Sequence, residues 1–137
     1  MSIKAGYSTP MLHVVEIERS IRFYELLGFV LIDTDRCEPT LGWARMHCEG
    51  GAVMFLRSEH EAENLAAGFF LYMYTPDLAG LREHLLANGV EVSAIKYPGY
   101  MPSGTVNLRD PDGCFIEIGH WGTGEQEAWE KRIGKTE

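Results

Sequence analysis

The chain has 137 residues, which is the size of one average domain. Hydrophobic residues make up 45% and charged residues 23%, a globular balance that excludes a disordered or collagen-like chain. Twelve Lys and Arg residues stand against twenty Asp and Glu residues, for a formal net charge of −8. This acidity argues against nucleic-acid binding and favours a small-molecule partner that is neutral or cationic.

Cysteine usage and hydropathy indicate the compartment. The three cysteines, Cys37, Cys48 and Cys114, form no CxxC pair and have no histidine at zinc-finger spacing, so we expect neither a disulfide framework nor a structural zinc site. The start of the chain has no apolar signal-peptide core, and the longest apolar run, 69–74, is too short to span a bilayer. These features predict a cytoplasmic protein without membrane association.

The sequence contains an internal repeat with an offset of 61 residues. A predicted strand at 9–14 precedes a predicted helix at 20–27, and the corresponding strand and helix lie at 70–75 and 81–88. Gly28 and Gly89 follow the two helices, where a left-handed residue would end each helix. The alternative is a chance coincidence of two strand-helix units.

After each helix the pattern predicts two or three strands, so each half has the order βαβββ. We therefore expect an α+β fold in which two tandem βαβββ modules form curved mixed sheets around a cavity. The predicted boundaries of this single domain, 1–137, are 7–58 for module one, about 58–68 for a linker, 69–120 for module two and 121–137 for a tail.

Side chains alternate between the two faces of a strand, so the apolar set of each first strand is expected to meet the helix. This assignment turns His13, Tyr72 and Tyr74 toward the cavity. Trp43, Arg45 and His47 also share one strand face, but the repeat aligns the last two with an apolar pair, so their orientation stays open. Trp43 next to Tyr72 and Tyr74 would form an aromatic wall suited to flat or cationic ligands, and ordinary core packing is the alternative.

Two further segments have less regular patterns. The segment 96–104 combines prolines, glycines and tyrosines, and it is interpreted either as a loop at the cavity mouth or as a plain surface turn. Tyr97, Tyr100 and Met101 are its candidate ligand contacts. In the tail, Trp129 and Ile133 are four residues apart, which allows either a short helix docked on a neighbour or a frayed end.

The segment Glu16–Phe29 resembles the D-x-x-x-S-x-x-F-Y-x-x-L-G-F signature of the glyoxalase, bleomycin-resistance and dioxygenase superfamily, also called vicinal oxygen chelate proteins. The segment Arg109–Glu117 resembles the D-P-D-G-x-x-I-E motif of the same superfamily. The resemblance implies the paired-module fold, with 96–104 near the cavity mouth and Glu117 inside. It implies no single reaction, because these proteins include isomerases, transferases, dioxygenases and metal-free antibiotic binders.

In the metal-dependent members of that superfamily, ligands come from the first and last strand of each module. The repeat places these positions at Thr9, Leu56, Phe70 and Glu117, of which only Glu117 is a usual metal ligand. We therefore expect no metal and no other cofactor. A displaced site of His13, His47 and Glu117 is the alternative, although His13 lies about 13 Å along the strand from Thr9.

The carboxylate of Glu117 lies between apolar residues and should be costly to bury unless it is paired. It is interpreted either as half of a buried ion pair with Arg45 or His47, as a ligand contact, or as a general base if it is desolvated and unpaired. Glu117 is the only candidate catalytic group. The complete set of candidate ligand-binding residues is His13, Trp43, Arg45, His47, Phe70, Tyr72, Tyr74, Tyr97, Tyr100, Met101 and Glu117.

The leading hypothesis is a metal-free protein that binds or sequesters a small aromatic or cationic compound. The alternatives are a glyoxalase-like metal-dependent lyase, isomerase or dioxygenase that uses Glu117, and a protein-interaction module suggested by the tail. Because two small sheets leave open edges, and because the resemblance implies paired modules, we also expect a homodimer.

Overall fold

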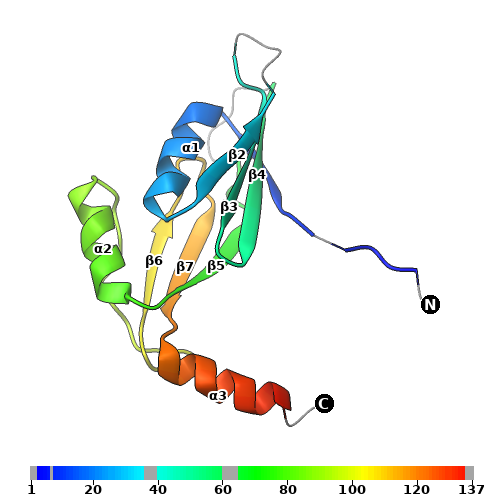
Figure 1. The fold of residues 1–137 in the computed structure, drawn as a ribbon. Coiled ribbons are helices and arrows are strands. Elements are labelled where there is room, and N and C mark those ends of the chain that lie inside the picture. The colour runs from blue at the N-terminus through cyan, green and yellow to red at the C-terminus, as the bar shows by residue number, and fades with distance from the viewer. Residues whose placement is uncertain (1–2, 7, 36–39, 60–64, 135–137) are drawn as a thin grey trace. The chain divides into compact units, whose positions relative to one another are not determined.

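The computed structural model describes residues 3–6, 8–35, 40–59 and 65–134 (Figure 1). It divides into two compact units. Unit 1 comprises Met1–Phe69 together with Asp110–Cys114, and unit 2 comprises Phe70–Arg109 together with Phe115–Glu137. Cys37 and residues 60–64 of the predicted linker lie outside the described residues.

Unit 1 contains one helix and a four-stranded mixed sheet. Its elements are β1 (Met11–Val14), α1 (Ile17–Leu26), β2 (Val30–Thr34), β3 (Trp43–Cys48) and β4 (Gly51–Arg57). The strand order is β1-β4-β3-β2, with β1 parallel to β4 and the other neighbours antiparallel. Helix α1 contacts β2, β3 and β4.

Alternation along the strands of unit 1 produces one apolar face. Leu12 and Val14 of β1 are fully buried, as are Ala44 and Met46 of β3. Cross-strand pairing places Leu12 and Ala44 in line with Phe55, a buried residue that packs on Tyr24 of α1. The prediction that the apolar set of the first strand packs inward is therefore confirmed, and His13 lies on the opposite face.

Unit 2 repeats this arrangement with a three-stranded sheet. Its elements are β5 (Phe70–Thr75), α2 (Leu78–Ala87), β6 (Thr105–Arg109), β7 (Phe115–His120) and α3 (Thr123–Gly134). The strand order is β5-β7-β6, with β5 parallel to β7 and β6 antiparallel to it. The buried apolar side chains of β6 and β7 share the face that α2 contacts; they are Val106, Leu108, Ile116 and Ile118.

The two helices end as the sequence predicts, because Gly28 and Gly89 follow them with φ of +96° and +79°. Side chains disfavour this left-handed conformation, which glycine adopts freely. The prediction of an α+β fold built from two related halves is confirmed. None of the described helices is long and apolar enough to cross a membrane.

The second half departs from the predicted βαβββ order at 91–96, where no regular strand forms among the described residues. Ser93 donates its backbone N–H to the carbonyl of Asn107, and the Ser93 hydroxyl accepts the Asn107 N–H in return. Only the bridge between Lys96 and Thr105 continues the pairing. The serine side chain replaces a backbone partner, which interrupts the ladder at this edge.

The registers of the two sheets show where the 61-residue offset stops applying. In unit 2 Tyr72 lies opposite Glu117, whereas in unit 1 Met11 lies opposite Met54. Because the separation is two residues longer in unit 2, the counterpart of Glu117 is Met54 and not Leu56. By the same register the counterpart of Arg45 is Asn107.

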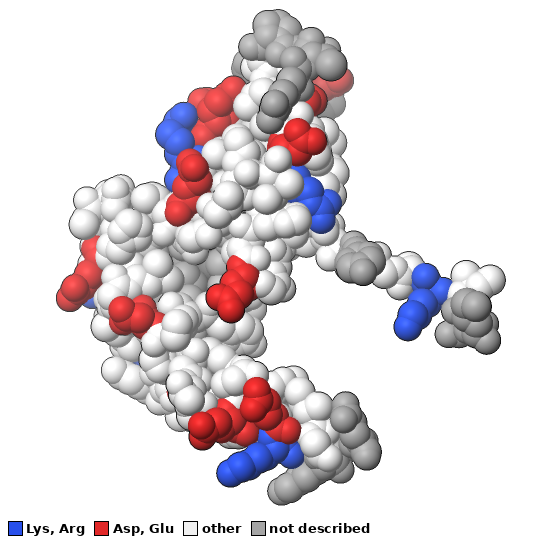
Figure 2. Space-filling view, viewed as in Figure 1, with Lys and Arg blue, Asp and Glu red and all other residues white. Residues whose placement is uncertain are grey.

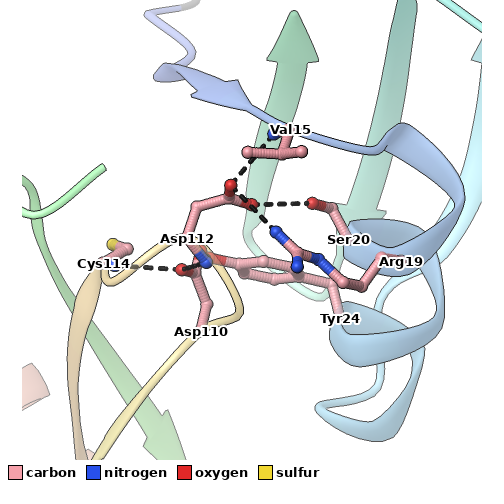
Figure 3. A network of polar contacts seen from close by, with 7 residues as sticks. All are labelled: Val15, Arg19, Ser20, Tyr24, Asp110, Asp112 and Cys114. Carbon is pink, nitrogen blue, oxygen red and sulfur yellow. Dashed lines mark hydrogen bonds and ion pairs between the residues drawn. The ribbon is translucent and has the colours of Figure 1, made fainter. Parts of the chain in front are cut away.

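A loop near the end of the chain completes unit 1 (Figure 3). The Asp112 carboxylate, 1% exposed, accepts from the Val15 N–H at 2.9 Å, from Arg19 at 3.1 Å and from the Ser20 hydroxyl at 3.5 Å. These groups surround the start of α1, whose own N-cap residue Glu16 makes no side-chain cap. A carboxylate from far along the chain therefore anchors the start of α1 through the residue before its N-cap and through two side chains of its first turns.

Asp110 holds the same loop in its turn. Its Oδ1 atom accepts from the N–H groups of Asp112 and Cys114, both at 2.9 Å, and its Oδ2 atom accepts from the Tyr24 hydroxyl at 2.7 Å. Burial raises the pKa of the Asp110 carboxyl, although these three donors act in the other direction. Burial followed by the Asp110 charge raises the pKa of Tyr24 well above its ordinary value.

The described part of the tail forms the helix α3, so of the two predicted alternatives the helix is the one present. Trp129 on this helix contacts Trp121 edge to face, with ring centroids 6.4 Å apart. Figure 2 shows acidic and basic side chains side by side on α3. Both Trp129 and Ile133 stay exposed.

Candidate functional site

The open face of the unit 2 sheet, which is the face away from α2, contains the carboxylate of Glu117. This side chain is only 6% exposed. The Tyr100 hydroxyl lies 3.0 and 3.1 Å from its two oxygens and donates to them. In the orientation that satisfies both neighbours, the Asn107 amide nitrogen donates to Glu117 Oε1 at 3.0 Å and to the Val106 carbonyl at 3.2 Å.

These donors are neutral, and within the described part of the chain no Lys, Arg or His forms an ion pair with Glu117. A buried carboxylate with only neutral donors keeps an uncompensated charge. Donation to this charge raises the pKa of Tyr100, because removing the proton would leave two negative groups in contact.

Tyr72 lies directly across from Glu117 in the β5–β7 register. Its hydroxyl is buried and has no hydrogen-bond partner among the described residues. Burial and then the adjacent Glu117 carboxylate raise the pKa of Tyr72. A Cβ atom on Gly119 would lie 3.3 Å from this hydroxyl and 2.5 Å from Met101 Cε, so the glycine leaves room for both side chains.

A row of aromatic rings continues from this polar group along β5. Phe70 stacks on Tyr72 with 4° between the ring planes and centroids 6.4 Å apart, and Tyr72 contacts Tyr74 at 5.2 Å. Trp121 extends the row from Tyr74 at 5.2 Å, and Phe115 flanks Phe70 at 4.8 Å. Phe70 and Tyr74 are 57% and 58% exposed, so this row offers ring faces to a ligand.

The segment 96–104 contributes to the same face of unit 2 through Tyr100. Met101 is buried and fixes the segment, and its N–H donates to the Pro98 carbonyl in a tight turn. Tyr97 is exposed and makes no described contact with Glu117. Of the two tyrosines predicted in this segment, Tyr100 therefore forms a described hydrogen bond to Glu117 and Tyr97 does not.

The open face of the unit 1 sheet has a different character. Arg45 donates from Nε to His47 Nε2 at 2.7 Å, from Nη2 to the Thr9 hydroxyl at 3.3 Å and from Nη1 to Met54 Sδ at 3.7 Å. This settles the orientation that the sequence left open, because Ala44 and Met46 point into the core instead. The exposed residue His13 and the half-buried residue Trp43 share this open face.

Residues 7–118 match the family described as the Glyoxalase/Bleomycin resistance protein/Dioxygenase superfamily. The chain belongs to this superfamily. No curated protein sequence matches it.

Solved structures of the superfamily fold are similar to this chain. A bleomycin-binding protein in complex with bleomycin has 21% identity and a TM-score of 0.66, covering 85% of this chain and 99% of that one. A bleomycin resistance determinant encoded on the transposon Tn5 has 22% identity and a TM-score of 0.67, covering 85% and 98%. TioX from Micromonospora sp. ML1 has 16% identity and a TM-score of 0.71, with the same coverage.

The metal positions that the superfamily implies do not fit a metal here. At the four expected positions only Glu117 is a usual ligand, and replacing Leu56 by Met54, the register counterpart of Glu117, adds no oxygen or nitrogen donor. The Thr9 hydroxyl accepts from the Arg45 guanidinium, a cation that would repel a divalent ion at that point. Across the described ranges no three His, Cys, Asp or Glu side chains converge.

The predicted site residues therefore divide between the units. Phe70, Tyr72, Tyr74, Tyr100 and Glu117 come together on the open face of unit 2, and Met101 supports them. The other predicted residues belong to unit 1; they are His13, Trp43, Arg45 and His47.

Asn107, Gly119 and Trp121 extend the site in unit 2 and were absent from the prediction. Alternation could have placed Gly119 on the face of Glu117, since the two are separated by two positions. The contact between Asn107 and Glu117 required the β6–β7 register.

Proposed function

We propose that this protein binds a small planar compound with a positive charge on the open face of unit 2, and sequesters it without a metal. The observation that carries this proposal is the buried carboxylate of Glu117, which has only neutral donors around it and adjoins a row of exposed aromatic rings. A cationic group would offset the uncompensated charge, and a flat ring system would stack on the aromatic row.

The polar groups beside the carboxylate suit the same kind of ligand. The Tyr72 hydroxyl has one donor and two acceptor positions without a described partner, so an N–H group of the ligand can donate to it. The gap at Gly119 gives that hydroxyl its space. An amidinium or protonated heteroaromatic amine combines the planar shape, the charge and the N–H groups.

The similarity to a bleomycin-binding protein and to a bleomycin resistance determinant supports binding over chemistry. The poor set of donors at the expected metal positions supports a protein that works without a metal. We further propose that the protein acts in the cytoplasm as a homodimer.

The proposed pairing uses β2, one of the two edge strands of the unit 1 sheet. Val30, Leu31 and Ile32 are 63%, 39% and 49% exposed on this strand. An edge strand with exposed apolar side chains is a template for pairing with another chain. A second copy of the same strand would cover these side chains and satisfy the free backbone groups.

The binding site is tested with three probes of one shape: benzamidinium, neutral benzamide and anionic benzoate. Full-length protein labelled with nitrogen-15 reports binding through the indole N–H signal of Trp121, assigned with Trp121→Phe. We expect benzamidinium to shift this signal saturably, with benzamide at least about tenfold weaker because it lacks the charge-assisted bond.

Glu117→Gln should weaken benzamidinium binding about tenfold or more, whereas Glu83→Gln on the exposed part of α2 makes the same charge change and should leave it intact. Equal binding of the cation by Glu117→Gln and the unaltered protein would refute the proposal. Thermal melting of both variants separates a loss of binding from a loss of folding.

A further inference from the structure

The guanidinium of Arg45 in unit 1 has no role in the site proposed on unit 2. It lies half-buried in the middle of the open sheet face, and its three described acceptors are an imidazole, a hydroxyl and a thioether. All three are uncharged, since a histidine that accepts at Nε2 carries its proton on Nδ1. The positive charge therefore has no compensating anion among these contacts.

The acid that lies across from Arg45 in the sheet register forms no ion pair with it. Asp33 of β2 lies across from Arg45 in the register, beside a bulge. Its carboxylate instead accepts from the N–H of Thr34 at 2.8 Å. The ion pairs of the described residues are Arg19 with Asp112 and Arg22 with Glu16, and neither includes Arg45.

Arg45 also has donors to spare. A guanidinium has five N–H groups, and the three described contacts use one on each nitrogen. One N–H therefore remains on Nη1 and one on Nη2, the pair of atoms through which arginine binds a carboxylate with two parallel bonds. His47 and Thr9 hold the plane of the group, so little side-chain freedom is left to lose on binding.

Apolar side chains also flank this guanidinium on the same sheet face. Cross-strand neighbours Met54 and Met11 lie in its row, and Trp43 and Leu56 form the next row of the same face. Met11 and Leu56 are 37% and 38% exposed, so they are accessible to a ligand. A flat apolar body can pack on these side chains while its anionic group meets Arg45.

We infer that the open face of unit 1 is a second binding site, which recognises a carboxylate carried on an aromatic or other apolar group through Arg45. The inference does not depend on the site proposed in unit 2. The formal charge of −8 disfavours a multiply charged anion such as phosphate, while one carboxylate matches one guanidinium in charge and geometry.

The test uses the indole N–H signal of Trp43 in the labelled full-length protein, assigned with Trp43→Phe. Benzoate should shift it saturably, and benzamide and inorganic phosphate should each bind at least about tenfold more weakly. Arg45→Gln should weaken benzoate binding about tenfold or more. Arg57→Gln, a change of the same charge at an exposed position of β4, should leave the affinity unaltered.

Two further variants keep the outcome decisive. If melting curves show that Arg45→Gln is unfolded, Arg45→Lys replaces it, and the loss of the planar donor pair should still weaken benzoate severalfold. Glu117→Gln should leave benzoate binding unchanged, so failure here is distinguishable from failure of the unit 2 proposal. Absence of saturable benzoate binding, unchanged binding by the Arg45 variants, or phosphate binding as tight as benzoate would each overturn the inference.

Discussion

The two halves of this chain begin their helices in different ways. Helix α2 uses its own Asp77, whose carboxylate accepts from the Gly80 N–H at 3.0 Å. Helix α1 has no side-chain cap of its own, and Asp112 occupies its start from 97 positions beyond Val15. The corresponding helices of the two halves therefore differ: α2 has a local side-chain cap, whereas the start of α1 is held by long-range contacts to Val15 and to the Arg19 and Ser20 side chains.

The open faces of the two sheets differ as well. In matching register positions, unit 1 has Met54 and Arg45 where unit 2 has Glu117 and Asn107. In both halves the buried face is apolar because it packs on a helix. The open faces carry charges of opposite sign. Packing constrains one face of each sheet and leaves the other available for binding.

The largest expected effect comes from removing the carboxylate that anchors the start of α1. Asp112→Ala removes the acceptor for three donors and leaves the Val15 N–H and the Arg19 guanidinium unpaired. We expect the free energy of unfolding to fall by about 2–4 kcal/mol, measured by urea denaturation. Asp112→Asn keeps an acceptor of the same shape and should lose less. A loss under about 1 kcal/mol for Asp112→Ala would mean that the loop does not stabilise α1.

The next largest effect is expected at the exposed β2 edge of the unit 1 sheet. Ile32→Lys places a charge on the exposed β2 edge and should weaken the proposed dimer about tenfold or more, measured by sedimentation over a range of concentrations. Leu86→Lys, at an exposed apolar position of α2, is the matched control and should not change the association. A monomer for the unaltered protein at tens of micromolar would remove the dimer altogether.

A smaller effect is expected at the local cap. Asp77→Ala removes one bond, to the Gly80 N–H, and should lower the free energy of unfolding by about 1 kcal/mol. Asp77→Ser keeps a side-chain acceptor and should recover most of it. If Asp77→Ala cost as much as Asp112→Ala in the same urea experiment, the contrast between the local cap of α2 and the long-range anchor of α1 would be wrong.

The smallest effect is a titration shift. The pKa values of Tyr24, Tyr72 and Tyr100 are raised, so the native protein should hold these three protons at a pH where an unfolded chain has released them. Their contribution to stability is complete below about pH 10 and is lost as the pH rises further. Near-ultraviolet absorbance should accordingly show a delayed group among the six tyrosines.

In the same titration, Glu117→Gln distinguishes Tyr100 of unit 2 from Tyr24 of unit 1. It should bring the Tyr100 titration down, because the bond to Glu117 is the main cause of its shift. Tyr24 should be unaffected, since burial and Asp110 raise its pKa. An unchanged absorbance curve for this variant would contradict the contact between Tyr100 and Glu117.

The sequence by itself determined the features that depend on near neighbours in the chain. Alternation identified the buried face of β1, and the glycines after α1 and α2 take the left-handed conformation that ends a helix. The two motifs identified the superfamily, and the apolar residues on either side of Glu117 indicated a buried carboxylate that needs hydrogen-bond or ionic partners.

Only the tertiary structure decided the strand registers and the partners of the polar groups. The 61-residue offset holds for the helices. Paired residues of β5 and β7, however, are two positions further apart in the sequence than those of β1 and β4, so the counterpart of Glu117 is Met54 and not Leu56. The acceptors of Arg45 and the unpartnered Tyr72 hydroxyl also emerged only there. Local conformation follows from adjacent residues, whereas register and polar pairing depend on the packing of segments tens of residues apart.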